Sequence, residues 1–196
     1  MNAFTITLAV VVSYFCGTLP SAIAVARSKG VDITSFGSGN PGASNVGRAL
    51  GTKYFVIVMV MDALKGAVPV ALMLGDRHIA YLCGAAAVVG HVFPVTRRFR
   101  GGKGVATGAG VVVVLHPFVL LAAFGSWLVV SKATGKASIA SIVAVPVVIG
   151  GFFVARVSMW EVWSMIGIGL LVEIRHIGNI KRLLSGSENR MSGSSS

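Results

Sequence analysis

Long apolar runs alternate with short polar loops along this chain. The apolar runs cover residues 4–26, 54–74, 79–95, 105–131, 138–155 and 158–174. A hydrocarbon core of ~30 Å takes about 20 helical residues to cross, so runs of this length predict transmembrane helices. The pattern therefore predicts an all-α fold, that of a polytopic integral membrane protein.

The longest run, residues 105–131, contains a break signal at His116-Pro117. Proline removes a backbone donor and disfavours helix in the preceding residue, so a break there predicts seven transmembrane helices in all. The half-runs of about 11 to 15 residues then cross ~30 Å only if the bilayer thins or the turn lies below the surface. The alternative is one unbroken span and six crossings, which leaves Arg175-His176 on the opposite side from the other polar loops.

Lysine and arginine residues indicate the side on which each loop lies. The first and third loops carry the cations Arg27, Lys29, Arg48, Lys53, Arg97, Arg98, Arg100 and Lys103, whereas the second loop has only Arg77 beside Asp76. Because cytoplasmic loops carry an excess of cations, this bias predicts an N-terminus outside and a cytoplasmic C-terminus. The first run has its charges behind it, so it is interpreted as a retained span rather than a signal peptide.

The composition agrees with a membrane protein and narrows the other possibilities. Hydrophobic residues make up 55% of the 196 residues and charged residues 12%, with a mean hydropathy of +0.83. The net charge of +11 gathers at the ends of apolar runs, so no nucleic acid partner is expected. Cys16 and Cys83 lie within apolar runs and are interpreted as small buried residues, not as disulfide partners or metal ligands.

Three polar clusters interrupt the apolar pattern, and each combines glycine, amide or histidine side chains and cations. The first cluster comprises Gly37, Ser38, Gly39, Asn40, Gly42, Asn45 and Arg48, the second His91, Gly101, Gly102 and Lys103, and the third Arg175, His176 and Asn179. Glycines let backbone N–H groups approach an anion, arginine offers a bidentate fork, and a lysine among glycines before a helix suits a phosphate. We expect the clusters to bind an anionic headgroup whose tail stays in lipid. Ordinary turns with topological charges are the alternative for each cluster taken alone.

Several common motifs do not fit these residues. Gly37, Gly39 and Gly42 match the spacing of a dinucleotide fingerprint but follow an apolar span instead of a strand. The second cluster has Arg97 where a P-loop has its first glycine, so a nucleoside triphosphate is not indicated. The chain has neither a Gly-x-Ser-x-Gly nucleophile elbow nor an acid five positions after any histidine.

The third cluster gives the most specific chemical indication. Arg175, Asn179 and Arg182 stand at helical positions i, i+4 and i+7, which predicts one shared face, and His176 is an i, i+3 neighbour of Asn179. We therefore expect His176 and Asn179 to contact one substrate together. Within the second run, Asp62 and Lys65 are expected to form a buried structural pair, because ionisable groups at membrane depth are costly and usually paired.

Five motifs stand in order along the chain. They are Gly-Ser-Gly-Asn-x-Gly-Ala-Ser-Asn-x-x-Arg at 37–48, Asp-x-x-Lys-Gly at 62–66, Gly-His-x-Phe-Pro at 90–94, Phe-Arg-Gly-Gly-Lys-Gly-Val-Ala-Thr at 99–107 and Arg-His-x-x-Asn-Ile-x-Arg-Leu-Leu-x-Gly-x-Glu at 175–188. With these motifs the chain resembles the bacterial acyl-phosphate:glycerol-3-phosphate acyltransferase family (PlsY) from about residue 13 to residue 188. Ser44 stands where that family has threonine, and Thr34 where it more often has arginine.

The resemblance implies transfer of a fatty acyl group from acyl phosphate to the 1-hydroxyl of glycerol 3-phosphate, giving lysophosphatidate and inorganic phosphate, the first acylation of phospholipid synthesis. It implies a seven-span protein of the bacterial inner membrane, with the active site facing the cytoplasm and with no cofactor, metal, acyl-CoA or acyl carrier protein. Residues 1–190 are expected to form a single transmembrane catalytic domain that acts as a monomer, and residues 191–196 a disordered tail.

The resemblance also assigns roles to residues. Ser38 and the surrounding backbone amides hold acyl phosphate, Arg48 and Lys103 clamp phosphate groups, and Asn45, His176 and Asn179 orient glycerol 3-phosphate. The expected catalytic residues are His176, Asn179, Ser38 and Lys103, and the expected substrate-binding residues are Gly37, Gly39, Asn40, Gly42, Asn45, Arg48, His91, Gly101, Gly102 and Arg175.

Two alternatives stay open at this point. His176 either takes the hydroxyl proton as general base or only hydrogen-bonds it while a substrate phosphate oxygen accepts the proton. The alternative function is a transporter or binding protein for a phosphorylated metabolite, which would use the same loops without chemistry. Against that alternative, no inverted repeat is visible in the sequence.

Overall fold

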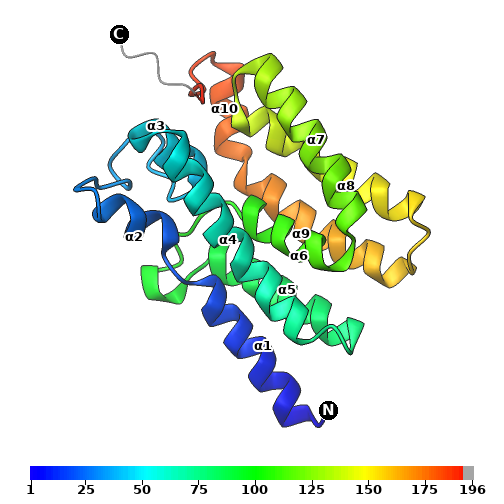
Figure 1. The fold of residues 1–196 in the computed structure, drawn as a ribbon. Coiled ribbons are helices and arrows are strands. Elements are labelled where there is room, and N and C mark those ends of the chain that lie inside the picture. Colours follow the sequence, from blue (N-terminus) through cyan, green and yellow to red (C-terminus); the bar gives the residue numbers. More distant parts are fainter. Residues whose placement is uncertain (192–196) are drawn as a thin grey trace.

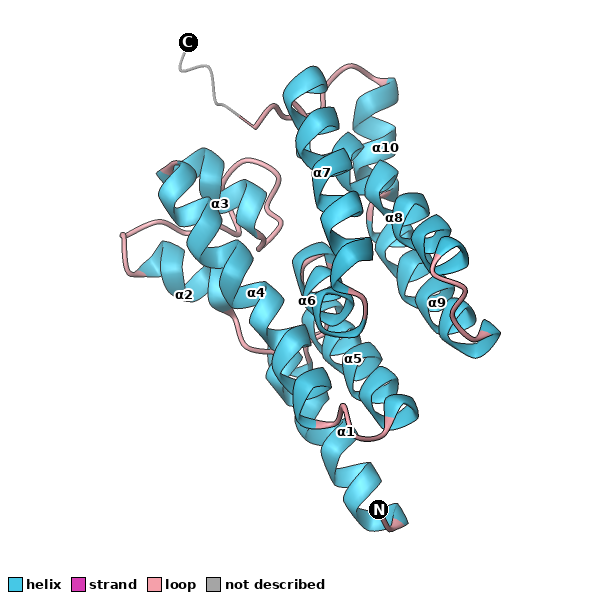
Figure 2. Ribbon diagram, turned by 45° about the vertical axis from the view of Figure 1, so that its right-hand side comes forward, coloured by secondary structure: helices cyan, strands magenta, loops and turns pink. Residues whose placement is uncertain are grey.

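The protein folds as a bundle of helices. The computed structural model describes residues 1–191, and all regular elements within them are helices: α1 (Ala3–Gly17), α2 (Ser21–Arg27), α3 (Ala43–Leu50), α4 (Thr52–Leu72), α5 (Arg77–Val92), η1 (Val95–Arg97), α6 (Val105–Leu115), α7 (Pro117–Thr134), α8 (Ala137–Val154), α9 (Met159–Arg175) and α10 (Ile177–Leu184). In Figures 1 and 2, α1 projects at one end of the bundle, while α2, α3 and α10 lie at the other. The predicted all-α fold is confirmed. The predicted disordered tail lies, apart from Met191, outside the described residues.

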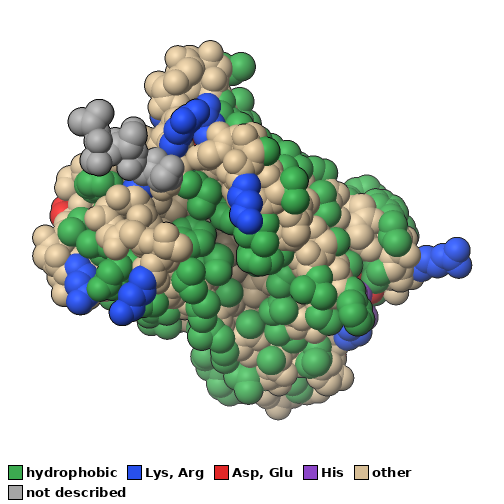
Figure 3. Space-filling model, turned by 45° about the horizontal axis from the view of Figure 1, so that its top comes forward, with side chains coloured by type: hydrophobic (Ala, Val, Ile, Leu, Met, Phe, Trp, Pro, Cys, Tyr) green, Lys and Arg blue, Asp and Glu red, His purple; other side chains and the backbone are tan. Residues whose placement is uncertain are grey.

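The outer surface of the bundle is apolar. Hydrophobic side chains cover most of the face drawn in Figure 3, with only scattered Lys and Arg side chains. Five helical segments are long and apolar enough to cross a membrane, and α6 is a shorter apolar helix. These five segments are Ala3–Arg27, Thr52–Leu72, Arg77–Arg97, Pro117–Thr134 and Ala137–Val154. Such an exterior is expected where lipid is the solvent.

The predicted break at His116-Pro117 is confirmed. α6 ends at Leu115 and α7 begins at Pro117, while His116 between them has an extended φ of −148°. The Pro117 ring is tolerated at the first helical position because its missing N–H would have no intrahelical partner there. α6 and α7 are therefore two separate helices rather than one continuous helix.

The first apolar run is also broken, which the sequence did not predict. Instead of one helix over residues 4–26, α1 ends at Gly17 and α2 begins only at Ser21, after Pro20. The predicted pair of Asp62 and Lys65 explains the break. Lys65 Nζ lies 2.6 Å from Asp62 Oδ1 and also donates to the carbonyl oxygen of Leu19, while the Ser21 hydroxyl donates to Asp62. At the break the Leu19 carbonyl oxygen lies between the two helices, and Lys65 supplies a hydrogen bond to it. The chain can therefore change direction between α1 and α2.

Glycines set how closely the long helices pack. A Cβ on Gly110 of α6 would lie 1.8 Å from the carbonyl oxygen of Ala63 on α4, and one on Gly66 of α4 would lie 2.1 Å from that of Thr107. Helices in membranes gain packing where small residues let backbones approach. The pair α4 and α6 is therefore fixed by two glycines, one from each helix.

We predict that Gly110→Ala destabilises the fold, although alanine favours helix over glycine by roughly 0.5–1 kcal/mol. The added methyl meets a backbone oxygen that cannot rotate away, and such overpacking typically costs ~1–3 kcal/mol. Thermal unfolding in detergent should show a lower midpoint for Gly110→Ala. The control is Gly150→Ala on α8, where an added Cβ meets nothing within 4 Å. An equal or higher midpoint for both variants would contradict the packing argument.

Candidate active site

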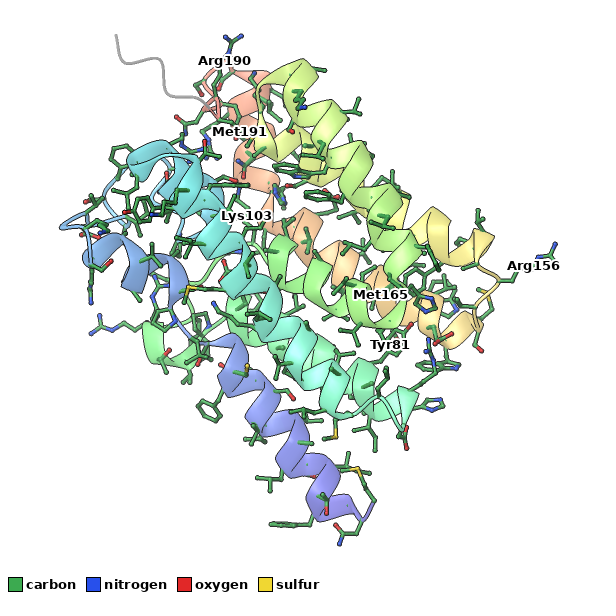
Figure 4. All side chains as sticks on the ribbon, viewed as in Figure 1. Tyr81, Lys103, Arg156, Met165, Arg190 and Met191 are labelled. Carbon is green, nitrogen blue, oxygen red and sulfur yellow. The ribbon has the colours of Figure 1, made fainter. Side chains whose placement is uncertain are left out.

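One cavity of about 230 Å³ is lined by residues from all three polar clusters. Of the residues predicted for the site, the lining includes Ser38, Asn40, Gly42, Asn45, Arg48, His91, Lys103, His176 and Asn179, and it does not include Gly37, Gly39, Gly101, Gly102 or Arg175. Lys103, labelled in Figure 4, stands between α4 and the C-terminal helices. Segments that are about 140 residues apart in the chain therefore share one site.

The first cluster forms a tight loop in front of α3. Gly37 and Gly39 have φ angles of +56° and +65°, which side chains with a Cβ rarely adopt. A Cβ on Gly37 would also lie 2.6 Å from the side-chain oxygen of Asn45. The two glycines shape the loop that presents Ser38 to the cavity, and this role explains their absence from its lining.

Asn45 is a positioning residue in this structure. Its side-chain nitrogen donates to the carbonyl oxygens of Ile33 and Phe36 at 3.1 and 2.9 Å, and its oxygen accepts from the Ser38 amide and from Arg48. An asparagine amide offers two donors and an acceptor with two lone pairs, so all four are occupied. The Asn45 side chain therefore has no free hydrogen-bonding group with which to orient glycerol 3-phosphate, the role expected from the sequence.

Arg48 lies beside Ser38, and part of its guanidinium has no hydrogen-bond partner in residues 1–191. Its Nη2 donates to Ser38 Oγ at 3.2 Å, whereas its buried Nε finds no hydrogen-bond partner within residues 1–191. Burial lowers the pKa of Arg48 and so disfavours its charge, against the attraction of Glu188. An anion in the cavity would supply the missing acceptor and the missing countercharge.

The glycines of the second cluster serve packing, which corrects the expectation that their amides bind phosphate. The amides of Gly101 and Gly102 donate to the carbonyl oxygens of Val92 and His91. A Cβ on Gly102 would lie 2.2 Å from His91 Nε2. Both amides are therefore used within the chain, and this leaves Lys103 and His91 as the cluster residues that line the cavity.

Lys103 is a cation that lacks a salt-bridge partner in the described part of the chain. None of the four salt bridges found within residues 1–191 involves it. Burial lowers the pKa of Lys103 to about 8; Glu188 opposes this shift, while Arg182, Arg48 and Arg175 reinforce it. A partly buried ammonium near three guanidinium groups is stabilised when an anion binds between them.

The third cluster is not one continuous helix, so the predicted shared face is wrong. α9 ends at Arg175, and α10 begins after His176. The Arg175 side chain donates to the carbonyl oxygens of Gly101 and Gly102 at 3.3 and 3.4 Å, away from the groups that Asn179 contacts. Arg175 thus fastens the end of α9 to the second cluster and does not line the cavity.

His176 is oriented as a hydrogen-bond acceptor toward the cavity that it lines. The residue is 1% exposed, and its Nδ1 lies 2.8 Å from the Val172 carbonyl oxygen. A carbonyl can only accept, so Nδ1 carries the proton and the lone pair is on Nε2. Burial, and then the Lys103 charge, lower the pKa of His176 to about 4. The imidazole is therefore neutral near pH 7 and able to accept a proton.

Glu188 is a cavity residue that sequence reasoning did not include in the site. It accepts from Asn179 Nδ2 at 2.6 Å and from Arg182 Nε at 2.8 Å. Burial favours the neutral acid, but these hydrogen bonds outweigh it and hold the pKa of Glu188 below its usual value. Its place at the end of the fifth motif was the only signal in the sequence. Ser138 at the start of α8, which also lines the cavity, stands in no motif.

Away from the polar mouth, the cavity continues as an apolar groove among α6, α7, α8 and α9. We define this apolar groove by Ala109, Val112, Leu120, Val145, Ile149 and Met165, which all line the cavity. Phe55 of α4 and Trp127 of α7 stack at 6.1 Å between their ring centroids beside it. A polar, cationic mouth thus opens directly onto a hydrocarbon-like space.

Comparison with known proteins agrees with this combination of features. The family model described as glycerol-3-phosphate acyltransferase matches residues 7–186. The glycerol-3-phosphate acyltransferase of Aquifex aeolicus is 41% identical over 185 residues, covering 92% of this chain and 96% of that protein. The one from Neisseria meningitidis is 41% identical over 198 residues, covering 95% and 97%.

Solved structures show the same arrangement of helices. The crystal structure of PlsY (YgiH), an integral membrane glycerol 3-phosphate acyltransferase, in its glycerol 3-phosphate form matches with a TM-score of 0.91 at 40% identity over 95% of each chain. Its lysophosphatidic acid form matches with a TM-score of 0.89 at the same identity and coverage. The likeness extends over nearly the whole chain, in both sequence and fold. This chain therefore belongs to the glycerol-3-phosphate acyltransferase family.

Proposed function

We propose that this membrane protein transfers a fatty acyl group from acyl phosphate to the 1-hydroxyl of glycerol 3-phosphate, giving lysophosphatidate and inorganic phosphate. The observation that carries the proposal is the Lys103 ammonium, which forms no salt bridge within residues 1–191 and lies with Arg48 at the mouth of an apolar groove. That arrangement fits a reactant with a phosphate at one end and a hydrocarbon chain at the other. Relatives that are named for acyl transfer to glycerol 3-phosphate, and neighbours solved in glycerol 3-phosphate and lysophosphatidic acid forms, support the same substrates.

The chemistry needs no covalent enzyme intermediate, because acyl phosphate is already activated. The 1-hydroxyl oxygen attacks the acyl carbon, the carbonyl oxygen becomes an oxyanion, and the bond from the acyl carbon to the phosphate oxygen then breaks. Phosphate leaves with the electron pair of that bond. The hydroxyl proton goes to His176 Nε2 or to a phosphate oxygen. The protein has to hold two anions side by side and stabilise the oxyanion.

Different residues of the cavity bind the phosphate groups and orient the acceptor. Lys103 and Arg48 neutralise the phosphate groups, and Ser38, kept near Arg48 by the loop, donates to the acyl phosphate. His176 and Asn179 lie beside the acceptor alcohol. Glu188 holds Asn179 by a 2.6 Å hydrogen bond. Asn45 and His91 act through other groups. Asn45 fixes Ser38 and Arg48, and His91 Nδ1 lies 3.7 Å from Asp62.

The proposed topology has seven spans, an external N-terminus and a cytoplasmic C-terminus. The separate helices α6 and α7 support this count, and the cavity shared by the second and third clusters supports a common side for both. The cationic loops put that side in the cytoplasm of the bacterial inner membrane. Residues 1–190 then act as one catalytic domain and as a monomer. Accessibility labelling of single cysteines introduced at Ser35 and at Ser158 tests the orientation, with Ser35 expected inside and Ser158 outside.

Phosphate release by the purified protein in detergent tests the reaction. We expect release only when acyl phosphate and glycerol 3-phosphate are both present, with lysophosphatidate formed in equal amount. A phosphorylated-metabolite transporter would bind glycerol 3-phosphate and release nothing. Turnover with acyl-CoA but not with acyl phosphate would refute the donor and keep the acceptor.

A further inference from the structure

The apolar groove borders the main core through Val112, Leu120 and Met165, and we call this end its closed end. Val112, Leu120, Ile149 and Met165 form what we call the floor of the groove, and they come from four different helices. Beyond the floor lies the main core, with Leu115, Val119, Phe152 and Val162 buried against one another. In Figure 4, Met165 lies between Lys103 at the mouth and Tyr81 on the far side of the floor.

A polar network fastens the far side of the floor. Arg77 of α5 pairs with Glu161 of α9, its Nε lying 2.8 Å from the carboxylate, and its Nη2 lies 3.0 Å from the ring nitrogen of His116. The His116 ring also packs edge-on against Phe152 at 4.5 Å. The turn between α6 and α7 is thus tied to α5, α8 and α9. Hydrogen bonds and ring packing among these side chains therefore hold the helices around the closed end in place.

The depth of the groove follows from helix geometry. On α9, eleven residues separate Met165 in the floor from His176 at the mouth. On α8, eleven residues separate Ile149 from Ser138. At a rise of 1.5 Å per residue, both helices give a depth of about 16 Å. The two helices therefore give the same distance from His176 and Ser138 at the polar mouth to the floor.

An extended acyl chain can be compared with that depth. Carbon–carbon bonds of about 1.5 Å with near-tetrahedral angles advance roughly 1.25 Å per carbon, so about 13 carbons fit between mouth and floor. We propose that the floor limits the acyl chain that the groove holds to about 14 carbons including the carbonyl carbon, with Met165 and Ile149 as the length-determining residues. This inference rests on the proposed function, since it needs a donor with a fatty acyl chain.

Gly108 offers a direct way to shorten the groove. It lines the cavity about one turn beyond the start of α6, and a Cβ added there meets only Ile168 Cγ2, at 3.9 Å. Gly108→Leu should therefore fill the groove without displacing the backbone. The matched control is Gly167→Leu on α9, because Gly167 is exposed and an added Cβ has nothing within 4 Å.

The measurement is kcat/KM for phosphate release with acyl phosphates of four to eighteen carbons. In the wild type we expect kcat/KM to stop rising near 14 carbons. In Gly108→Leu the ratio of tetradecanoyl to butanoyl phosphate should fall at least tenfold, while Gly167→Leu keeps the wild-type ratio. Met165→Ala, and Ile149→Ala where the former is unstable, should move the limit up by two or three carbons.

The outcomes separate this inference from the proposed function. A wild-type enzyme that uses acyl phosphates, with the same chain-length profile in Gly108→Leu, Met165→Ala and Ile149→Ala, would overturn the floor as the limit. A protein that is inactive with acyl phosphate of every length but active with acyl-CoA would overturn the proposed donor. The same chain-length series with acyl-CoA would then decide whether the floor sets the limit.

Discussion

Replacing Lys103 by alanine is expected to lower kcat/KM for phosphate release by about 10²–10³, or ~2.7–4 kcal/mol, as for the loss of an oxyanion-hole donor. Its ammonium has no salt-bridge partner within residues 1–191 and lines a cavity whose two proposed reactants are both anions. Arg48→Ala should lose a similar factor, because Arg48 is the other cation placed beside Ser38.

A matched control for Lys103→Ala is Lys53→Ala, since Lys53 is an exposed cation that does not line the cavity. We expect Lys53→Ala to keep wild-type turnover. Near-normal turnover in Lys103→Ala, measured on protein with an unchanged unfolding midpoint, would mean that Lys103 does not contact the reacting phosphate.

The lowered pKa of Lys103 predicts a pH dependence of donor binding. With a pKa of about 8 in the unliganded protein, Lys103 is charged below pH 8 and loses its proton as the pH rises through that value. The KM for acyl phosphate should therefore increase above pH 8. In Lys103→Arg the guanidinium stays charged at much higher pH, so KM should stay flat across the same range even if its value differs. A rise in KM that is identical in both proteins would assign the titration to another group.

Replacing His176 by alanine is expected to lower kcat by about 10²–10⁴, the usual range for a lost general base. The hydrogen bond from Nδ1 to Val172 fixes the ring so that Nε2 can accept the hydroxyl proton. Because the pKa of His176 is about 4, the ring is already neutral above pH 5, and protonation should abolish activity only as the pH falls toward 4.

The pH profile of the remaining activity in His176→Ala decides between the two proton acceptors. If the acid limb near pH 4 disappears, His176 is the base; if the profile keeps its wild-type shape, a substrate phosphate oxygen takes the proton. The control is His78→Ala, whose ring is exposed and stacks on Trp160 at 4.1 Å outside the cavity. Wild-type kcat in His176→Ala would remove His176 from the mechanism altogether.

Local chemistry made some features predictable from the sequence. Pro117 disfavours helix at His116, the residue before it, and the spacing of Asp62 and Lys65 puts both on one helical face, where each can pair with the other. Both features came out as expected. The break after Gly17 was not predicted, because residues 4–26 were interpreted as one apolar run despite Pro20, and the lysine that binds the Leu19 carbonyl oxygen at the break comes from far along the chain.

The functions of individual cluster residues were harder to predict, because composition does not show which hydrogen bonds are already taken. Asn45 and the amides of Gly101 and Gly102 are of the right type for binding an anion, yet the chain itself uses them. Glu188 ends the fifth motif, but the sequence assigned it no role. Only the folded chain shows it beside Asn179.

The carboxylate of Asp62 joins three helices, which limits how this protein can be engineered. One oxygen, Oδ1, receives Ser21 from α2 and Lys65 from α4, and His91 from α5 lies 3.7 Å away. Changing any one member alone leaves a buried donor or charge without its partner. Sequence libraries should therefore vary Ser21, Asp62 and Lys65 together or leave all three untouched.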